Sequence, residues 1–230
     1  DFRYTADDLM DYFDGKQIWS LVLINPDNPT GNYIPYEDCL RLIQWCQERD
    51  IVLVVDESFI DFSSEHPTFL NNGILSQNDH LVVVKSISKS YGVPGLRLGV
   101  LATANQSLMV NLRREMSIWN INSFGEFFLQ ILGKYEKAYA QAMDAFREER
   151  SHFVKALENI SYLRVIPSEA NYVLCEVKER FTARELAVRL LREYGILIKD
   201  CSQKCKGNYI RLAVRDTNDN NQLLDALREL

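Results

Sequence analysis

Lys89 stands in a run of small polar residues that could surround an anion. The run at residues 85–90 reads KSISKS, follows the apolar residues 81–84, and precedes Arg97, which comes eight positions after Lys89. Hydroxyl groups and a guanidinium suit phosphate oxygens, so Ser86, Ser88 and Arg97 are candidates for a phosphate site. A lone lysine is usually a solvated surface charge, whereas a partly buried one has a lowered pKa and can form a Schiff base.

Two further polar groups follow apolar runs. Asp56 ends the run Ile51–Val55, and a carboxylate at the exit of a buried strand costs free energy unless it is paired. It could cap a helix or form an ion pair, or it could face a cationic group of a ligand. The segment NPDNPTG at 25–31 offers a similar choice, because its residue types form turns, yet the loop could present Asn28 to a ligand.

The first half of the chain contains the elements that must position these groups. Short runs that are apolar on both faces alternate with amphipathic stretches, which is typical of central parallel strands covered by helices. We expect strands at 21–25, 51–55, 81–84 and 98–102, and helices at 36–49 and 106–116. In such α/β sheets the functional residues gather at the carboxyl ends of the strands.

The second half shows a different pattern. Residues 124–159 contain no proline and no strand signal, so we expect one or two long helices there, with a break near Gly133. Strands at 171–176, 196–199 and 209–214, with helices at 182–193 and from Thr217 onward, predict an α+β unit. We therefore divide the chain into a partial large domain at 1–130, a linking helix at 131–160 and a small domain at 161–230.

Composition excludes several classes of protein. The 230 residues carry a net charge of −6, and 47% of them are hydrophobic, which is enough for a sizeable core. An acidic chain without a basic run argues against nucleic acid as a partner, and the absence of any apolar stretch of about 18 residues argues against a membrane span. The five scattered cysteines indicate reduced thiols and a cytoplasmic location. The histidines 66, 80 and 152 lack metal-ligand spacing, so no metal is expected.

The three polar segments, in this order, resemble those of fold-type I enzymes that depend on pyridoxal 5′-phosphate (PLP), in the class I/II aminotransferase group. Histidinol-phosphate aminotransferases and threonine-phosphate decarboxylases are the most similar subgroups. Three motifs in order, each after an expected strand, are far more specific than one. The matching residues are Asn28-Pro29-Thr30-Gly31, Asp56-Glu57, Ser86-x-Ser88-Lys89 with Arg97, and Tyr209–Val214. The resemblance implies part of the family's α/β large domain followed by a smaller α+β domain.

The resemblance also implies how the cofactor is held. Lys89 would bind PLP covalently and later move a proton between the substrate Cα and the cofactor. Asp56 would face the pyridine nitrogen, where an anion keeps that nitrogen protonated and lets the ring accept an electron pair. Asn28 would bind the ring 3′-oxygen, with a cis peptide bond before Pro29. The cofactor phosphate is expected on Ser86, Ser88 and Arg97.

For the substrate, the resemblance implies that Arg211 binds the α-carboxylate as a bidentate pair. Lys199 stands where phosphate-binding relatives place a basic residue, which suggests an amino acid or amine with a distal phosphate or phosphonate. Asn171 stands where relatives approach the substrate. Lys199 could instead be an exposed lysine at a strand end, and Asn171 could simply bind backbone groups.

Three functions remain open. Transamination comes first, because it is the commonest activity of this fold group. Decarboxylation of a phosphorylated amino acid is the alternative, and the two reactions differ in which bond to Cα stands perpendicular to the cofactor ring. The third possibility is a non-catalytic or incomplete domain of a fusion protein. Relatives are homodimers, so a homodimer is expected of the full-length protein.

The sequence departs from the family pattern at two places. Phe59 stands where many relatives carry a tyrosine that donates a hydrogen bond to the 3′-oxygen. Nothing before Asn25 resembles the family's Gly-rich phosphate loop or the aromatic residue that stacks on the cofactor ring. We therefore expect that the chain lacks part of the family's large domain and binds PLP weakly or not at all by itself.

Overall fold

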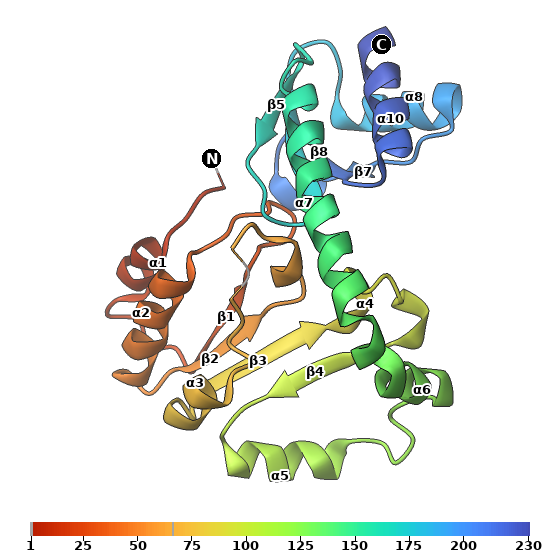
Figure 1. Ribbon diagram of the computed structural model, residues 1–230. Helices are drawn as coiled ribbons and strands as arrows, with labels where there is room; N and C mark the ends of the chain where they lie inside the picture. Colours follow the sequence, from red (N-terminus) through yellow and green to blue (C-terminus); the bar gives the residue numbers. More distant parts are fainter. Residues whose placement is uncertain (1, 66) are drawn as a thin grey trace. The chain divides into compact units, whose positions relative to one another are not determined.

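The computed structural model, which describes residues 2–65 and 67–230, contains a four-stranded sheet built from the apolar runs of the first half (Figure 1). Its order is β1-β2-β3-β4. The first three strands are parallel and β4 is antiparallel, so the predicted α/β class is confirmed. The strands are β1 (Ser20–Ile24), β2 (Val52–Asp56), β3 (Leu81–Ser86) and β4 (Gly99–Ala102).

One face of this sheet is buried and the other is open. Leu21, Leu53 and Val83 lie in the core, together with side chains of α2 (Tyr36–Gln47), beside which α1 (Ala6–Phe13) packs. On the opposite face, Val22 is 62% exposed and Leu101 is 40% exposed. The strand register places Asp56 on the open face as well, because Asp56 pairs with Val84 and Val84 pairs with Leu101.

The strands lead into short helical turns at their carboxyl ends. A 3-10 turn, η1 (Ile60–Phe62), follows β2, and α4 (Ile87–Ser90) follows β3 directly. The remaining elements of this region are α3 (Asn72–Gln77), η2 (Pro94–Leu96), α5 (Gln106–Glu115), α6 (Ser123–Ile131) and η3 (Leu132–Tyr135). Asn105 and Asn122 cap α5 and α6 by accepting hydrogen bonds from Leu108 N and Gly125 N.

The second half forms an antiparallel sheet in the order β5-β6-β8-β7. Leu186 and Leu190 of one helix pack against Ile210 and Leu212 of the sheet in a common core. The expected long helix is interrupted around Gly133, where η3 joins α6 to α7. The elements are α7 (Glu136–Leu157), β5 (Leu163–Ile166), β6 (Tyr172–Val177), α8 (Ala183–Tyr194), β7 (Lys199–Asp200), α9 (Ser202–Cys205), β8 (Tyr209–Ala213) and α10 (Thr217–Glu229).

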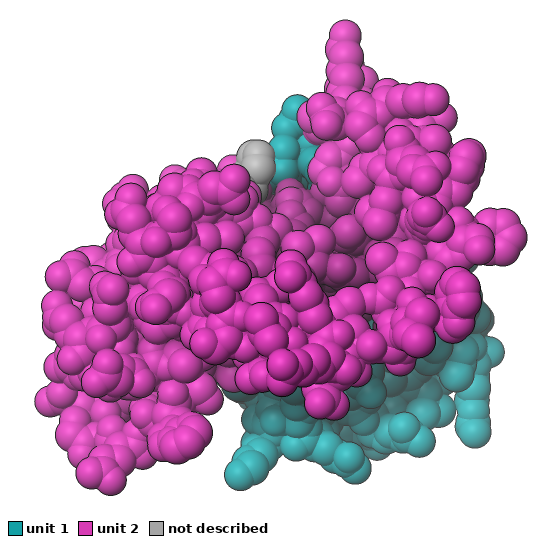
Figure 2. Space-filling view, turned by 90° about the horizontal axis from the view of Figure 1, so that it is seen from below, with its two compact units in different colours: residues 1–2, 27–32, 142–230 teal, residues 3–26, 33–141 magenta. Residues whose placement is uncertain are grey.

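The described residues group into two compact units, which Figure 2 colours separately. The N-terminal unit comprises residues 3–26 and 33–141 apart from residue 66, and the C-terminal unit comprises residues 2, 27–32 and 142–230. The short loop 27–32 joins the C-terminal unit because Glu169 N donates to Gly31 O at 2.9 Å and the Tyr172 hydroxyl donates to Asp27 O at 2.7 Å. Gly31 has φ +76°, and a Cβ there would lie 2.0 Å from Ser168 Oγ, so this approach requires glycine.

The position of the cis peptide bond differs from the one expected from the sequence. The cis peptide bond joins Asn25 to Pro26, so the expectation of a cis bond before Pro29 is wrong. Within the described residues, no helix is long and apolar enough to cross a bilayer. The same residues contain no group of three or more His, Cys, Asp or Glu arranged to hold a metal. His66 lies outside the described residues.

Candidate functional site

Asp56 lies at the carboxyl end of β2, half-buried on the open face of the sheet. Its Oδ1 accepts a hydrogen bond from Ser58 N at 2.9 Å, which fixes the carboxylate beside the turn that follows the strand. The next residue, Glu57, is only 1% exposed and accepts a hydrogen bond from Phe69 N at 2.7 Å. Of these two adjacent carboxylates, Glu57 is therefore a structural group of the core, and Asp56 is the one that a ligand can reach.

Ser86, Ser88 and Arg97 line one cavity of about 430 Å³ at the carboxyl end of β3. Ser58 lines it too, and its Oγ accepts a hydrogen bond from Ser86 N at 3.0 Å. Hydroxyls and one guanidinium around a small cavity match the oxygens of a phosphate group. The structure thus brings together the three residues that the sequence selected and adds Ser58, which follows Asp56 by two positions and which the sequence analysis missed.

Lys89 lies on α4, and its side chain is exposed. Of the two alternatives that the sequence left open, a solvated lysine and a partly buried one, the structure shows the solvated lysine. The reason is the geometry of the turn, because Ile87, Ser88 and Ser90 are buried and position 89 therefore points to the other side. Lys89 and Asp56 nevertheless stand just beyond the carboxyl ends of neighbouring parallel strands, β3 and β2.

Asn28 and Arg211 meet within the C-terminal unit. Arg211 Nη1 donates to Asn28 Oδ1 at 2.7 Å, and Lys204 Nζ donates to the Asn28 carbonyl oxygen at 2.9 Å. The Arg211 guanidinium also lies 4.7 Å from the centre of the Tyr172 ring. Arg211 thus engages the amide oxygen of Asn28, and the Nδ2 group is the hydrogen-bond donor of that side chain.

Arg211 and Lys199 line the same pocket, which has a volume of about 850 Å³. They are direct partners across strands β8 and β7, so their side chains share one face of the sheet. Arg184 and Lys204 bring two further cations to this pocket, while Val188, Leu191 and Leu197 form an apolar wall. The sequence analysis named neither Arg184 nor Lys204.

One carboxylate lines this pocket, that of Asp200. Ser202 donates to Asp200 Oδ1 from its backbone N at 2.9 Å and from its hydroxyl at 2.5 Å. These hydrogen bonds from Ser202 lower the pKa of Asp200. With four cations against one carboxylate already engaged by Ser202, the pocket favours an anionic ligand.

Asn171 lies just before β6, outside the residues that line the pocket. Its carbonyl oxygen accepts a hydrogen bond from Val214 N at 3.0 Å. Its side-chain Oδ1 is buried and has no hydrogen-bond partner among the described residues. The candidates thus form two sets: Asp56, Ser86, Ser88, Lys89 and Arg97 in the N-terminal unit, and Asn28, Asn171, Lys199 and Arg211 in the C-terminal unit.

A family model described as aminotransferase class I and II matches residues 1–227. The chain belongs to this family. Pyridoxal 5′-phosphate is the family's cofactor, so the predicted family and cofactor are confirmed. The hydroxyls of Ser58, Ser86 and Ser88 with the Arg97 guanidinium are groups of the kind that bind a phosphate. The half-buried Asp56 carboxylate is a group of the kind that stabilises a protonated ring nitrogen.

Three similar proteins illustrate the range of the family. The chain is 35% identical to the CMP-5′-(3-aminopropyl)phosphonate synthase of Streptomyces rubellomurinus, over 100% of this chain and 37% of that protein. It is 32% identical to the L-serine phosphate decarboxylase of Sulfurospirillum multivorans, over 100% of this chain and 60% of that protein. The crystal structure of the histidinol-phosphate aminotransferase from Clostridium acetobutylicum has a TM-score of 0.86 and 26% identity, over 97% of this chain and 66% of that one. The chain thus spans less than two thirds of each of these relatives.

Proposed function

We propose that the full-length protein is a PLP-dependent decarboxylase of an amino acid that carries a distal phosphate or phosphonate. The observation that carries this proposal is the pocket in which Lys199, Arg211, Arg184 and Lys204 meet. A substrate with both a carboxylate and a phosphate-type group offers two anions to these four cations. The printed activity of the Sulfurospirillum relative, a decarboxylase of serine phosphate, supports the same substrate class.

The residues of the C-terminal unit bind the substrate in this proposal. Arg211 holds the α-carboxylate and Lys199 meets the distal anion as a point charge, with Lys204 and Arg184 adding to the positive field. Asn28, oriented by Arg211, donates to the 3′-oxygen of the cofactor ring. Asn171 is assigned a contact with the substrate, and its buried Oδ1 is the atom that would accept a hydrogen bond.

The residues of the N-terminal unit hold the cofactor and move the proton. When bound, PLP supplies a sink for the electron pair that the departing carboxylate leaves at Cα. Asp56 holds a proton on the ring nitrogen, and Ser58, Ser86, Ser88 and Arg97 hold the phosphate. Lys89 provides the amine that anchors the cofactor and afterwards delivers a proton to Cα. The net reaction turns one amino acid into one amine and one molecule of carbon dioxide.

Transamination is the second candidate, and one observation favours it. The chain is 30% identical over its whole length to the histidinol-phosphate aminotransferase of Thermoanaerobacter pseudethanolicus. Both reactions use the same residues, so the distinction depends on the substrate bond that the pocket holds perpendicular to the ring.

The decisive measurement uses the full-length protein loaded with PLP and incubated with phosphoserine or phosphothreonine. A decarboxylase releases carbon dioxide and forms the corresponding amine in stoichiometric amounts without any keto acid. A transaminase releases no carbon dioxide and transfers the amino group only when 2-oxoglutarate or another keto acid is present. The second result would overturn the proposed reaction, and no turnover of any phosphorylated amino acid would overturn the proposed substrate class.

A further inference from the structure

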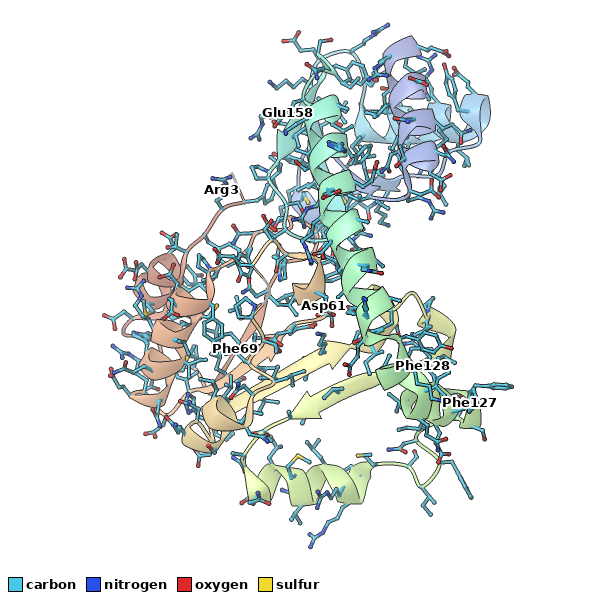
Figure 3. The ribbon with its side chains drawn as sticks, viewed as in Figure 1. Arg3, Asp61, Phe69, Phe127, Phe128 and Glu158 are labelled. Atoms are coloured by element: carbon cyan, nitrogen blue, oxygen red, sulfur yellow. The ribbon has the colours of Figure 1, made fainter. Side chains whose placement is uncertain are left out.

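A partly buried ion pair anchors the entrance of the turn that carries Lys89. Lys85, the penultimate residue of β3, places its Nζ 2.6 Å from Asp61 Oδ1, and the two side chains are only 14% and 17% exposed. Asp61 belongs to η1, which follows β2, and in Figure 3 it lies near the carboxyl end of β3. An ion pair shielded from water is much less screened than a surface pair, so it fixes the two turns against each other.

An aromatic stack anchors the exit of the same turn. Tyr91, the C-cap of α4, stacks on Tyr139 in the first turns of α7, with ring centres 4.1 Å apart and planes 10° from parallel. Phe128 of α6 adds an edge-on contact at 6.3 Å to the Tyr91 ring. In Figure 3, Phe128 and the neighbouring Phe127 are both labelled on α6, and Phe127 is 60% exposed.

The two anchors lie close to each other. The Tyr139 hydroxyl is buried and has no hydrogen-bond partner among the described residues, and the Asp61 carboxylate is near enough to affect its ionisation. Burial raises the pKa of Tyr139, and the Asp61 charge raises it further, so the phenol stays neutral. Asp61 therefore holds the entrance of the turn through Lys85, and Tyr139 holds its exit through the ring stack with Tyr91.

We propose that Asp61 and Tyr139 are positioning residues that hold the turn 87–90, and with it the backbone of Lys89, in place for reaction with the cofactor. This inference rests on the proposed role of Lys89. Neither residue is assigned a contact with cofactor or substrate. Asp61 acts on Lys89 through Lys85, and Tyr139 acts on it through Tyr91.

The turn at residues 87–90 needs these two anchors, the Lys85–Asp61 ion pair and the Tyr91–Tyr139 stack, which together we call the clamp. A helix of four residues has too few hydrogen bonds to be stable by itself, so tertiary contacts must hold α4. The exposed side chain of Lys89 samples many rotamers, and a mobile backbone would add to that freedom. A displacement of about 1 Å can slow a reaction by roughly two orders of magnitude. Fixing both ends of the turn limits such displacement.

The test uses the full-length protein and four variants. Tyr139→Leu removes the ring stack, and Tyr139→Phe keeps the stack but removes the hydroxyl. The double variant Asp61→Asn/Lys85→Met removes the ion pair without leaving a buried charge unpaired. Tyr135→Phe is the matched control, because Tyr135 lies just before α7 and is 58% exposed.

Two readouts separate positioning from general stability. Hydrogen exchange reports the opening of residues 87–92 relative to the core strands β2 and β3. The second readout is the share of pyridoxal phosphate that borohydride traps on Lys89, rather than on the exposed Lys178 and Lys206, measured against pH by peptide mass spectrometry. In Tyr139→Leu and in the double variant, we expect exchange at 87–92 to accelerate roughly fivefold and the Lys89 share to fall by a similar factor. We expect Tyr139→Phe to stay close to the wild type in both the exchange rate at 87–92 and the Lys89 share, and Tyr135→Phe to change neither.

The outcomes are distinct. Unchanged exchange at 87–92 in Tyr139→Leu and in the double variant overturns the clamp. So does acceleration that is equal in the turn and in β2 and β3, because that is a loss of global stability only. If the wild-type protein shows no preference of the label for Lys89, the proposed role of Lys89 fails, while the exchange data still decide whether the clamp exists.

Discussion

The two units carry different kinds of side chain at their candidate anion sites. The N-terminal unit offers mainly short hydroxyl groups, those of Ser58, Ser86 and Ser88, with one guanidinium, that of Arg97. Strand pairing and the hydrogen bond to Ser58 fix the backbone of Ser86. The C-terminal unit offers long cations that converge from α8, β7, α9 and β8. Short groups on fixed backbone suit a resident phosphate that never changes, whereas long cations adapt to a substrate that enters and leaves. This difference supports the proposal that the N-terminal unit binds the cofactor phosphate and the C-terminal unit binds the substrate.

The largest expected effect tests the N-terminal half of this division. Lys89→Ala should abolish both turnover and the visible absorbance of bound PLP, because no other amine is assigned to the cofactor aldehyde. Absorbance spectra and activity of the full-length variant check this. Lys134→Ala, at an exposed lysine of the same unit, is the control and should behave as wild type. Retained turnover in Lys89→Ala would disprove the assignment.

Asp56→Asn should have the next largest effect. An amide cannot hold a proton on the ring nitrogen, so turnover should fall by roughly two to four orders of magnitude. The cofactor should still bind, because the phosphate cradle of Ser86, Ser88 and Arg97 is unchanged. Steady-state kinetics, together with the cofactor content of the purified variant, measure the two effects separately, and full activity would refute the role of Asp56.

The sequence predicted the N-terminal unit well because its signals are local. Apolar runs that end in polar residues indicate parallel strands, and each motif stands directly after its strand, so the predicted strands agree with β1 to β4 within two residues at either end. The exposure of Lys89 could not be derived from the sequence, because the direction of a side chain on a four-residue helix depends on which neighbours pack inward.

The C-terminal unit was less accessible to sequence reasoning. The strand β5 was missed because its four residues, LRVI, include a charge and follow a long helix closely. Arg184 and Lys204 were missed for a different reason. They come from a helix and a short turn, and only the tertiary fold brings them to Lys199 and Arg211.

Two variants that each remove one cation test whether the N-terminal unit binds the cofactor phosphate and the C-terminal unit binds the substrate. Arg97→Met should raise the Kd for PLP and leave the KM for substrate unchanged once the cofactor saturates. Lys199→Met should raise the KM by roughly tenfold or more, in line with one lost charge-assisted hydrogen bond, and leave cofactor binding unchanged. Cofactor titrations and initial rates at saturating PLP check both variants, with Lys178→Met as the surface control. An effect of Lys199→Met on the Kd for PLP would contradict the assignment of Lys199 to the substrate alone.

The smallest effect concerns how each unit's stability responds to pH. Burial raises the pKa of Glu57 above its ordinary value of 4.5, so its contribution to folding is present below that value and is lost as the pH rises through the folded-state pKa. Hydrogen bonds from Ser202 lower the pKa of Asp200 below 3.8, so its contribution is present above that value and is lost as the pH falls. We expect Glu57→Gln to lose the part of the wild-type stability that decreases as the pH rises, and Asp200→Asn to lose the part that decreases as the pH falls. Urea unfolding of both variants and of the wild type across mildly acidic pH measures the two changes. Equal slopes in both variants would contradict the contrast between a carboxyl buried in a core and one held by a hydroxyl at a pocket.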